Sequence, residues 1–291
     1  MSEEIVGIIG GTGLGDVLGT QIEDARQRRV RTPFGRCSGP ILVGHLGPRK
    51  VAFVNRHGEG HVLSPSQVPY AANLFALKSL GVTTVLATGA VGSLRKQIEP
   101  RHLVLVDQFI DKTYRRQNTF FEKGPAVHCE FDAPCCGRLR KVLRRVAART
   151  KGMTHEDGTY VCMEGPQFST RAESLMHQDW GGDLIGMTAL PEAKLAREAQ
   201  MCYALIALVS DYDAWKPHPR GKGRHDLLRE IIANLDAATL NAIELIEAVL
   251  RLDEPLADAR CACRRSLDLA VWTRQEYIKS DQMERLAVLF K

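Results

Sequence analysis

The stretch Cys202-Tyr203-Ala204-Leu205-Ile206-Ala207-Leu208-Val209-Ser210-Asp211-Tyr212-Asp213 determines the expected fold. Its apolar part is typical of a strand that is buried on both faces. Asp211 and Asp213 follow directly, at the end of a strand where a βα sheet forms its ligand crevice. One carboxylate there can hold or transfer a proton while the other positions it. An exposed turn or a helix cap is the alternative interpretation of the same acids.

Similar apolar runs alternate with helical patterns along the chain. The strand-like runs are Ile5–Ile9, Ile41–Val43, Val51–Asn55, Val82–Ala87, Leu103–Val106, Tyr160–Met163, Leu184–Ile185 and Cys202–Ser210. The helical patterns begin near Ser66, Gly137, Thr170, Pro191 and Asp226. The third pattern opens with a capping box, which predicts a helix start at Thr170. This alternation predicts the α/β class, with a mixed or parallel sheet flanked by helices.

Composition narrows the class of protein. The 291 residues fit one large α/β domain or two small ones, and a hydrophobic share of 44% can fill a sizeable core. The formal charge of +5 is spread along the chain without a basic stripe, so we expect no nucleic-acid partner. No apolar run approaches the roughly 20 residues that span a bilayer, and no signal peptide is evident. We therefore expect a cytoplasmic protein without a membrane partner.

Eight cysteines in a chain of this length do not indicate a disulfide framework. His128, Cys129, Cys135 and Cys136 can be drawn as a zinc site, but vicinal cysteines are a poor tetrahedral pair. We therefore expect no metal.

The chain changes character after about residue 250. Basic and acidic residues are interleaved in 251–291, and Leu286, Leu289 and Phe290 fit one short amphipathic helix. We expect a main domain over residues 1–250 and a helical C-terminal appendage over residues 251–291, to which the sequence assigns no role.

Three clusters that follow predicted strands suit an anion. Gly10–Gly15 offers backbone N–H groups and the Thr12 hydroxyl, although its spacing matches neither G-x-G-x-x-G nor Walker A. Arg56-His57 offers a planar fork suited to phosphate. Thr88–Ser93 again exposes backbone N–H groups without bulky side chains. A plain tight turn and a surface arginine are the structural alternatives.

Two further clusters suit a nucleoside. In Glu164–Ser169, Phe168 has a ring that can stack on a flat base, and in Gly186–Thr188, Met187 can pack under a sugar. Either side chain is more often plain core.

The ordered motifs together resemble the methylthioadenosine phosphorylases, a subgroup of the trimeric purine nucleoside phosphorylases. The resemblance covers roughly residues 4–250. The motifs that carry it are Gly10–Gly15, Arg56-His57, Gly89–Leu94, Asp107–Asp111, Glu164–Arg171, Met187-Thr188 with Pro191-Glu192, and Asp211–Asp213. It implies the nucleoside phosphorylase fold, whose mixed sheet is partly barrel-like.

The resemblance also implies roles for individual residues. The implied phosphate ligands are Thr12, Arg56, His57, Gly89, Ala90 and Thr188. Met187 would contact the ribose. The implied base pocket consists of Phe168, Ser169, Asp211 and Asp213, with the two aspartates as the catalytic acids. His128 would reach the 5′ pocket of a neighbouring subunit, and Arg224 or His225 would lie near the 5′ position.

By the same resemblance, the reaction is phosphorolysis of S-methyl-5′-thioadenosine to adenine and 5-methylthioribose 1-phosphate. The implied enzyme is a pentosyltransferase of purine salvage. It needs inorganic phosphate as co-substrate and no cofactor, and it works as a homotrimer or as a dimer of trimers. Relatives that prefer 6-oxopurines tend to have an acid near position 169 and an asparagine near position 211. A carboxylate at Asp211 favours a 6-amino group instead.

Three positions depart from the family pattern. Gly89 replaces a common hydroxyl residue, Gly186 replaces a common asparagine, and Gly221–His225 is more polar than usual. A phosphorylase of adenosine or of 6-oxopurine nucleosides such as inosine and guanosine is therefore the alternative activity. A dinucleotide-binding enzyme and a catalytically weakened binding protein are the alternatives from other classes. The glycine spacing speaks against the first, and Arg56 with Asp211 against the second.

Overall fold

The computed structural model describes residues 4–217, 221 and 223–290, with the side chains of Asp16 and Arg224 outside that description. Its strands are β1 (Ile5–Gly10), β2 (Glu23–Arg28), β3 (Ile41–Leu46), β4 (Arg49–Asn55), β5 (Thr84–Ser93), β6 (Leu103–Leu105), β7 (Gln108–Lys112), β8 (Thr154–His155), β9 (Thr159–Met163), β10 (Leu184–Gly186) and β11 (Cys202–Tyr212). Its helices are α1 (Leu14–Leu18), α2 (Tyr70–Ser79), α3 (Gly137–Ala147), α4 (Arg171–Asp179), α5 (Ala189–Glu198), α6 (Arg224–Leu250) and α7 (Ser280–Leu286). Short 3-10 turns complete the list: η1 (Gly19–Gln21), η2 (Glu59–His61), η3 (Ala262–Arg265), η4 (Gln275–Tyr277) and η5 (Ala287–Phe290).

The described strands form one mixed sheet that branches at β5. The main path runs β2-β3-β4-β1-β5-β10-β9-β7, and β11 pairs with both β5 and β6 off this path. Strand β5 is parallel to β1 and β11 but antiparallel to β10. One strand thus pairs with three neighbours, so the sheet branches at β5. The α/β prediction, with a mixed sheet flanked by helices, is confirmed.

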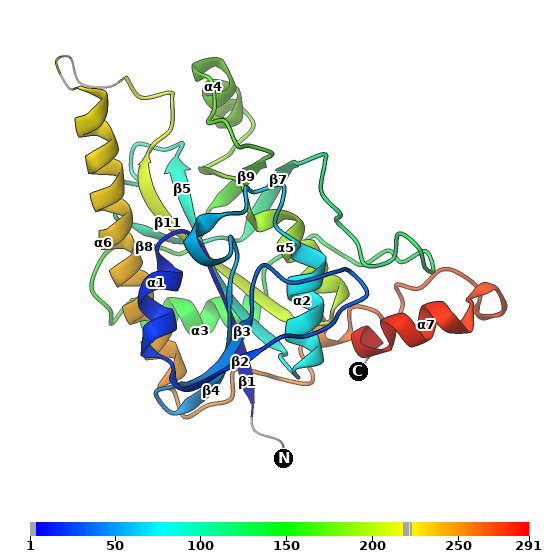
Figure 1. Cartoon of the computed structure of the whole chain (residues 1–291). Coiled ribbons are helices and arrows are strands. Elements are labelled where there is room, and N and C mark those ends of the chain that lie inside the picture. The colour runs from blue at the N-terminus through cyan, green and yellow to red at the C-terminus, as the bar shows by residue number, and fades with distance from the viewer. Residues whose placement is uncertain (1–3, 218–220, 222, 291) are drawn as a thin grey trace.

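Strand β11 separates two hydrophobic cores. Tyr203, Leu205, Ala207 and Val209 point into the core under α2 and α5. Cys202, Ala204, Ile206 and Leu208 point to the other face, where α1, α3 and α6 pack. This period-2 alternation explains why the whole run is apolar, since both faces of the strand are covered. Figure 1 shows α6 along one side of the sheet and α2 with α5 along the other.

Several element boundaries differ from the sequence-based prediction. Strand β5 continues through Thr88–Ser93, which was expected to be a loop, because β11 and β10 pair with it along this stretch. Strand β2 escaped prediction because all six of its residues are exposed and none forms an apolar pattern. Helix α2 starts at Tyr70 rather than near Ser66, directly after Pro69. The predicted capping box at Thr170 is present with both of its hydrogen bonds.

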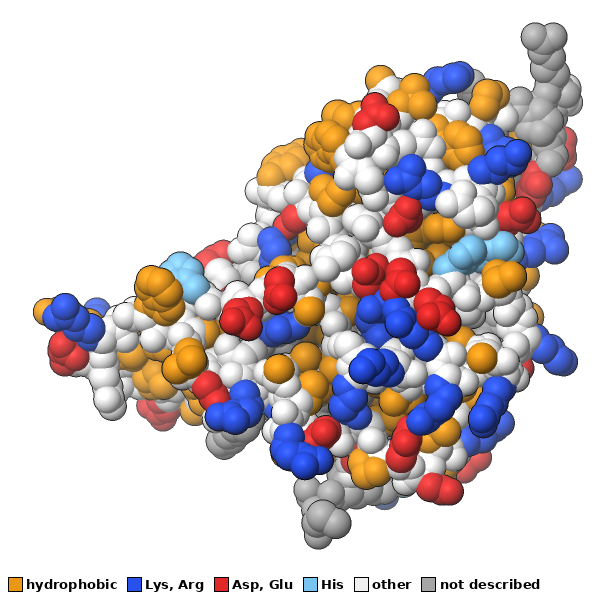
Figure 2. Space-filling model, turned by 180° about the vertical axis from the view of Figure 1, so that it is seen from behind, with side chains coloured by type: hydrophobic (Ala, Val, Ile, Leu, Met, Phe, Trp, Pro, Cys, Tyr) orange, Lys and Arg blue, Asp and Glu red, His pale blue; other side chains and the backbone are white. Residues whose placement is uncertain are grey.

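The C-terminal residues pack onto the same cores. Leu256 and Cys263 join the core on the α3 and α6 side, whereas Leu267, Leu286 and Leu289 join the core under α2 and α5. Leu286 ends α7 and Leu289 and Phe290 lie in η5, so the predicted single helix is a short α-helix followed by a 3-10 turn, with Leu286 and Leu289 buried and Phe290 half-buried. On the face shown in Figure 2, basic and acidic side chains are intermixed. None of the described helices combines the length and apolar character needed to cross a bilayer.

Candidate active site

Backbone pairing brings the ends of several parallel strands to one place. Gly10 at the end of β1 pairs with Asn55 at the end of β4, and the N–H of Arg56 donates to the Gly10 carbonyl at 3.0 Å. On the other side of β1, Ile9 pairs with Ala87 of β5. The segments that begin at Gly11, Arg56 and Thr88 therefore converge, as expected for loops at one edge of a parallel sheet.

Arg56 is the buried cation of this region, with 0% of its surface exposed. Its Nε and Nη2 donate to both carboxylate oxygens of Glu192 at 2.8 and 2.9 Å, and Nη1 donates to the Thr88 carbonyl at 2.7 Å. Burial alone would lower the pKa of Arg56, but the Glu192 carboxylate holds it above its ordinary value. A guanidinium has five N–H groups, so one on each Nη remains beyond these three bonds. The surface-arginine alternative is wrong.

Gly11 packs directly against that guanidinium. A Cβ at this position would lie 2.9 Å from the Thr88 carbonyl oxygen and 3.0 Å from Nη1 of Arg56, so a side chain does not fit. The N–H of Gly11 donates to the Thr88 hydroxyl at 3.2 Å. Thr12 follows in the loop and is exposed. The glycine-rich loop after β1 thus lies against a fixed cation, an arrangement suited to an oxyanion.

His57, next to Arg56, is buried and neutral at pH 7. Burial and the Arg56 charge lower the pKa of His57 to about 4. Its Nδ1 lies 2.7 Å from the Leu63 carbonyl, which can only accept, so Nδ1 carries the proton. The other nitrogen, Nε2, is then an acceptor. It suits the protonated oxygen of a hydrogen phosphate.

Thr188 faces the same region from the far side. It is the residue before α5, and its hydroxyl oxygen lies 3.8 Å from the position that a Cβ at Gly89 would occupy. Gly89 and Ala90 belong to β5, and Ala90 is half-buried. The structure therefore brings Thr188 close to Gly89, and Gly89 close to Gly11, whose Cβ would lie 3.3 Å from the Gly89 Cα.

Tyr160 explains one departure from the family pattern. Its hydroxyl fills the space that a side chain at Gly186 would occupy, and it accepts the N–H of Thr188 at 3.3 Å. Tyr160 is 1% exposed, so it cannot move aside. The hydroxyl thus stands where an asparagine side chain at position 186 would lie.

Sequence reasoning missed Arg116. Its guanidinium donates to Glu164 at 3.2 Å, to the Glu164 carbonyl at 2.7 Å and to the Leu190 carbonyl at 2.7 Å, and it also reaches the Met187 carbonyl. Arg116 therefore ties the segment that carries Phe168 to the segment that carries Met187. The sequence offers no signal for this role, because Arg116 lies in a polar stretch without periodicity.

The 164–169 segment is partly open to solvent. Phe168 is 85% exposed, so it is not a core residue. Ser169 donates to the Met163 sulfur at 3.8 Å. A Cβ at Gly165, where φ is +67°, would collide with the thioether of Met187. The start of this segment therefore packs against Met187, the predicted ribose contact, and the Phe168 ring has a face open to solvent.

Asp211 and Asp213 lie at the end of β11. Asp211 pairs with Gly92 across a bulge, so it belongs to the strand and the turn or cap interpretation is wrong for it. Its Oδ1 accepts from the Ser210 hydroxyl at 2.6 Å, and the residue is half-buried. Asp213 is 7% exposed, and its Oδ2 is buried with no hydrogen-bond partner among the described residues. A buried carboxylate oxygen of this kind can accept from a bound ligand.

His128 lies away from these strand ends. Its N–H donates to the Ala270 carbonyl at 2.9 Å, and its ring packs edge-on against Trp272 at 5.2 Å between centroids. Both side chains are exposed. Within one chain, His128 therefore belongs to the surface beside the C-terminal segment.

Arg224 and His225 begin α6. His225 is exposed. The side chain of Arg224 and all of Lys222 lie outside the described residues, so the predicted 5′ segment is only partly placed.

The thiols do not form the cluster that the sequence suggested. Among the described residues, the group with metal-binding geometry is Cys136, Cys202, Cys261 and Cys263. Neither His128 nor Cys129 nor Cys135 belongs to it.

Comparison with known proteins identifies the family. The family model described as the phosphorylase superfamily matches residues 5–251. The chain belongs to the phosphorylase superfamily. Among its relatives, S-methyl-5′-thioadenosine phosphorylase of Cereibacter sphaeroides is 47% identical over 271 residues, or 92% of this chain and 91% of that protein. Family membership confirms an enzyme of the pentosyltransferase type.

Solved structures agree with this assignment. A methylthioadenosine phosphorylase from an antarctic soil metagenomic library superposes with a TM-score of 0.87 and 38% identity, covering 99% of each chain. The methylthioadenosine phosphorylase of Schistosoma mansoni in complex with tubercidin gives a TM-score of 0.82 and 33% identity, covering 94% of this chain and 100% of that one. The predicted resemblance to methylthioadenosine phosphorylases is confirmed.

Proposed function

We propose that this phosphorylase cleaves S-methyl-5′-thioadenosine with phosphate, giving adenine and 5-methylthioribose 1-phosphate. The observation that carries the proposal is the buried pair of Arg56 and Glu192, which fixes a cation beside Gly11 and Thr88. The names of the relatives compared above support the choice of nucleoside.

Phosphate binds between the β1 loop, the end of β4 and the N-terminus of α5. The proposed ligands are the free N–H groups of Arg56, the hydroxyls of Thr12 and Thr188, the backbone at Gly89 and Ala90, and Nε2 of His57. Phosphate then attacks the anomeric carbon. Its negative charge also stabilises the oxocarbenium character that develops on the sugar.

The purine leaves toward Asp211 and Asp213. Asp211 holds or delivers the proton at N7, and the unpartnered oxygen of Asp213 accepts from a 6-amino group. Phe168, which offers a free ring face, stacks on the base beside Ser169. Met187 packs under the ribose.

The 5′ end of the nucleoside lies near His225, Arg224 and a neighbouring subunit's copy of His128. We propose a homotrimer, or a dimer of such trimers, because Phe168 is 85% exposed and Trp272 is 71% exposed beside the exposed His128. A neighbouring chain that covers these side chains would close the site.

Eight free thiols suit a reducing cytoplasm, where we propose that the enzyme acts without a cofactor for the reaction.

A substrate panel tests the proposed nucleoside. With saturating phosphate, kcat/KM should fall in the order methylthioadenosine, adenosine, inosine. Inosine should be at least about 100-fold worse than methylthioadenosine, since it leaves a carboxylate facing a 6-oxo group. Preference for inosine over both adenine nucleosides would contradict the proposal.

A further inference from the structure

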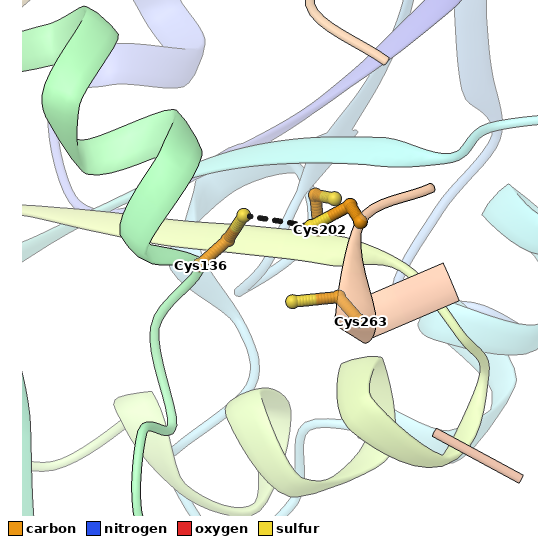
Figure 3. Close-up of side chains that lie close together, drawn as sticks. Cys136, Cys202 and Cys263 are labelled. Atoms are coloured by element: carbon orange, nitrogen blue, oxygen red, sulfur yellow. Dashed lines mark hydrogen bonds between the residues drawn. The ribbon is translucent and has the colours of Figure 1, made fainter. Parts of the chain in front are cut away.

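Four cysteine thiols from three distant parts of the chain meet at one point. The Sγ atoms of Cys136, Cys202, Cys261 and Cys263 all lie within 4.8 Å of one another. Figure 3 shows Cys136, Cys202 and Cys263 pointing toward one another from the start of α3, the start of β11 and the C-terminal segment. We propose that this cluster binds one zinc ion through four thiolates.

The sulfurs are spaced as in a zinc site, and none of the four is joined in a disulfide. Cys136 and Cys261 have Sγ atoms 3.6 Å apart. A disulfide needs about 2.05 Å between sulfurs. Four sulfurs at about 2.3 Å from zinc define a tetrahedron whose edges are about 3.8 Å. The cluster is therefore already close to the size of the filled site.

Backbone hydrogen bonds hold three of the four ligands in position, and Cys263 lies in η3. The N–H of Cys136 donates to the Tyr203 carbonyl at 2.8 Å, and that of Cys202 donates to the Thr83 carbonyl at 2.8 Å. Cys261 precedes η3, where its N–H donates to Asp258 at 3.0 Å and its carbonyl accepts from Arg264 at 2.8 Å. Little rearrangement would be needed on metal binding.

The surroundings also suit thiolates. A zinc ion with four thiolates carries a net charge of −2, which a buried site must balance. Cys136 is the N-cap of α3, so the positive end of that helix faces it. Arg138 follows in the first turn of α3, where its Nη2 donates to the Leu256 carbonyl and its positive charge lies near the cluster.

Only one of the two vicinal cysteines takes part. Cys135 packs in the core under α2 and α5, whereas Cys136 lies in the core on the α3 and α6 side. Consecutive residues in extended backbone point to opposite sides. Adjacent cysteines therefore do not both bind the metal, as the sequence analysis argued. Cys202, Cys261 and Cys263 supply the remaining thiols. The expectation of no metal is replaced by this proposal.

The site is structural rather than catalytic. All four ligands come from the protein, and Cys136, Cys202 and Cys263 are buried, so no coordination position faces substrate. Cys202 and Asp211 stand at opposite ends of β11, about 30 Å apart at about 3.3 Å per residue. The metal would clamp the segment after residue 250 onto α3 and β11.

The direct test is the metal content of the whole reduced protein. It would be purified without a histidine tag, reconstituted with zinc, freed of loose metal and analysed by mass spectrometry. We expect about one zinc per chain, with X-ray absorption showing four sulfurs at about 2.3 Å. A content below about half a zinc per chain, or a shell containing nitrogen or oxygen, would overturn the proposal.

Matched variants locate the metal. Cys263→Ala and Cys261→Ala should each lower the zinc content at least about tenfold, since three thiolates leave the tetrahedron open. Cys135→Ala removes a buried thiol next to the cluster and should keep the zinc. Wild-type zinc content in both cluster variants would overturn the proposal. If a variant fails to fold, the absorption spectrum of the wild type still decides.

Discussion

Arg56 and Glu192 form a two-point ion pair, at 2.8 and 2.9 Å, with 1% of each side chain exposed. Tyr203 donates to the same carboxylate at 2.8 Å. The pair is too deeply buried to be a surface salt bridge, and removal of one partner would strand the other charge. Its role in our account is to aim the two remaining Nη protons at phosphate.

Arg56→Lys tests that role. Lysine keeps the positive charge opposite Glu192 but loses the planar fork. We expect kcat/KM for phosphate to fall by about 10–100-fold, corresponding to about 1.5–3 kcal/mol for a hydrogen bond to a charged group. Arg49→Lys, at an arginine that binds Glu4 and the Leu250 carbonyl instead, serves as the control. Unchanged phosphate kinetics in Arg56→Lys would contradict the phosphate assignment.

Gly89→Ser tests the missing hydroxyl. A Cβ at Gly89 would lie 3.8 Å from the Thr188 hydroxyl oxygen, which is an ordinary contact, so serine should fit. The added donor should lower the KM for phosphate about fivefold, as a net gain of about 1 kcal/mol implies. Gly186→Ser is the matched contrast. The Tyr160 hydroxyl occupies that space, and overpacking should cost about 1–3 kcal/mol of unfolding free energy. Equal stability of the two variants would contradict this packing.

His57 should make the fold sensitive to acid. Its pKa is lowered to about 4 by burial and by Arg56, against about 6.5 in an unfolded chain. Between those values only the unfolded chain binds the proton, so the contribution of His57 to stability is full above pH 6.5 and is lost as the pH falls toward 4. When the pH falls from 7.5 to 5, wild type should lose more stability than His57→Gln. The free energy of unfolding of the variant, measured in denaturant, should therefore rise by about 1–2 kcal/mol relative to that of wild type. His225→Gln, at an exposed histidine, is the control, and an equal rise there would contradict the argument.

Asp211→Asn tests the base pocket. An amide can donate permanently to N7 or O6 but cannot deliver a proton to leaving adenine. The ratio of kcat/KM for adenosine to that for inosine should fall by 100-fold or more, since buried polar contacts support discrimination up to about 10⁴. Asp253→Asn, an exposed carboxylate beyond the end of α6, is the control. An unchanged ratio in Asp211→Asn would place this acid away from the base.

The sequence predicted the sheet because β11 and β1 are apolar on both faces. It failed where tertiary pairing overrides local pattern. The glycines of Thr88–Ser93 suggested a loop, yet β11 and β10 extend the strand through them. The all-exposed β2 has no pattern to detect because its strand state comes from pairing with β3.

Part of the candidate site was also predictable from the sequence. Arg56 follows β4 and Thr188 precedes α5, and the topology brings both close to Gly89 of β5, so motif order sufficed to group them. The role of Arg116 and the cluster of four cysteines were not predictable. Arg116 and its partner Glu164 are 48 residues apart in the sequence, and Cys136 and Cys261 are 125 residues apart. No local sequence pattern indicates contacts over such separations.

The central claim is that phosphate, and not water, cleaves the nucleoside. The most direct measurement is adenine release from methylthioadenosine in phosphate-free buffer and after addition of phosphate, with the sugar product followed by phosphorus NMR. We predict release only with phosphate, and one sugar 1-phosphate formed per adenine. Adenine released at the same rate without phosphate, together with unphosphorylated methylthioribose, would contradict the account.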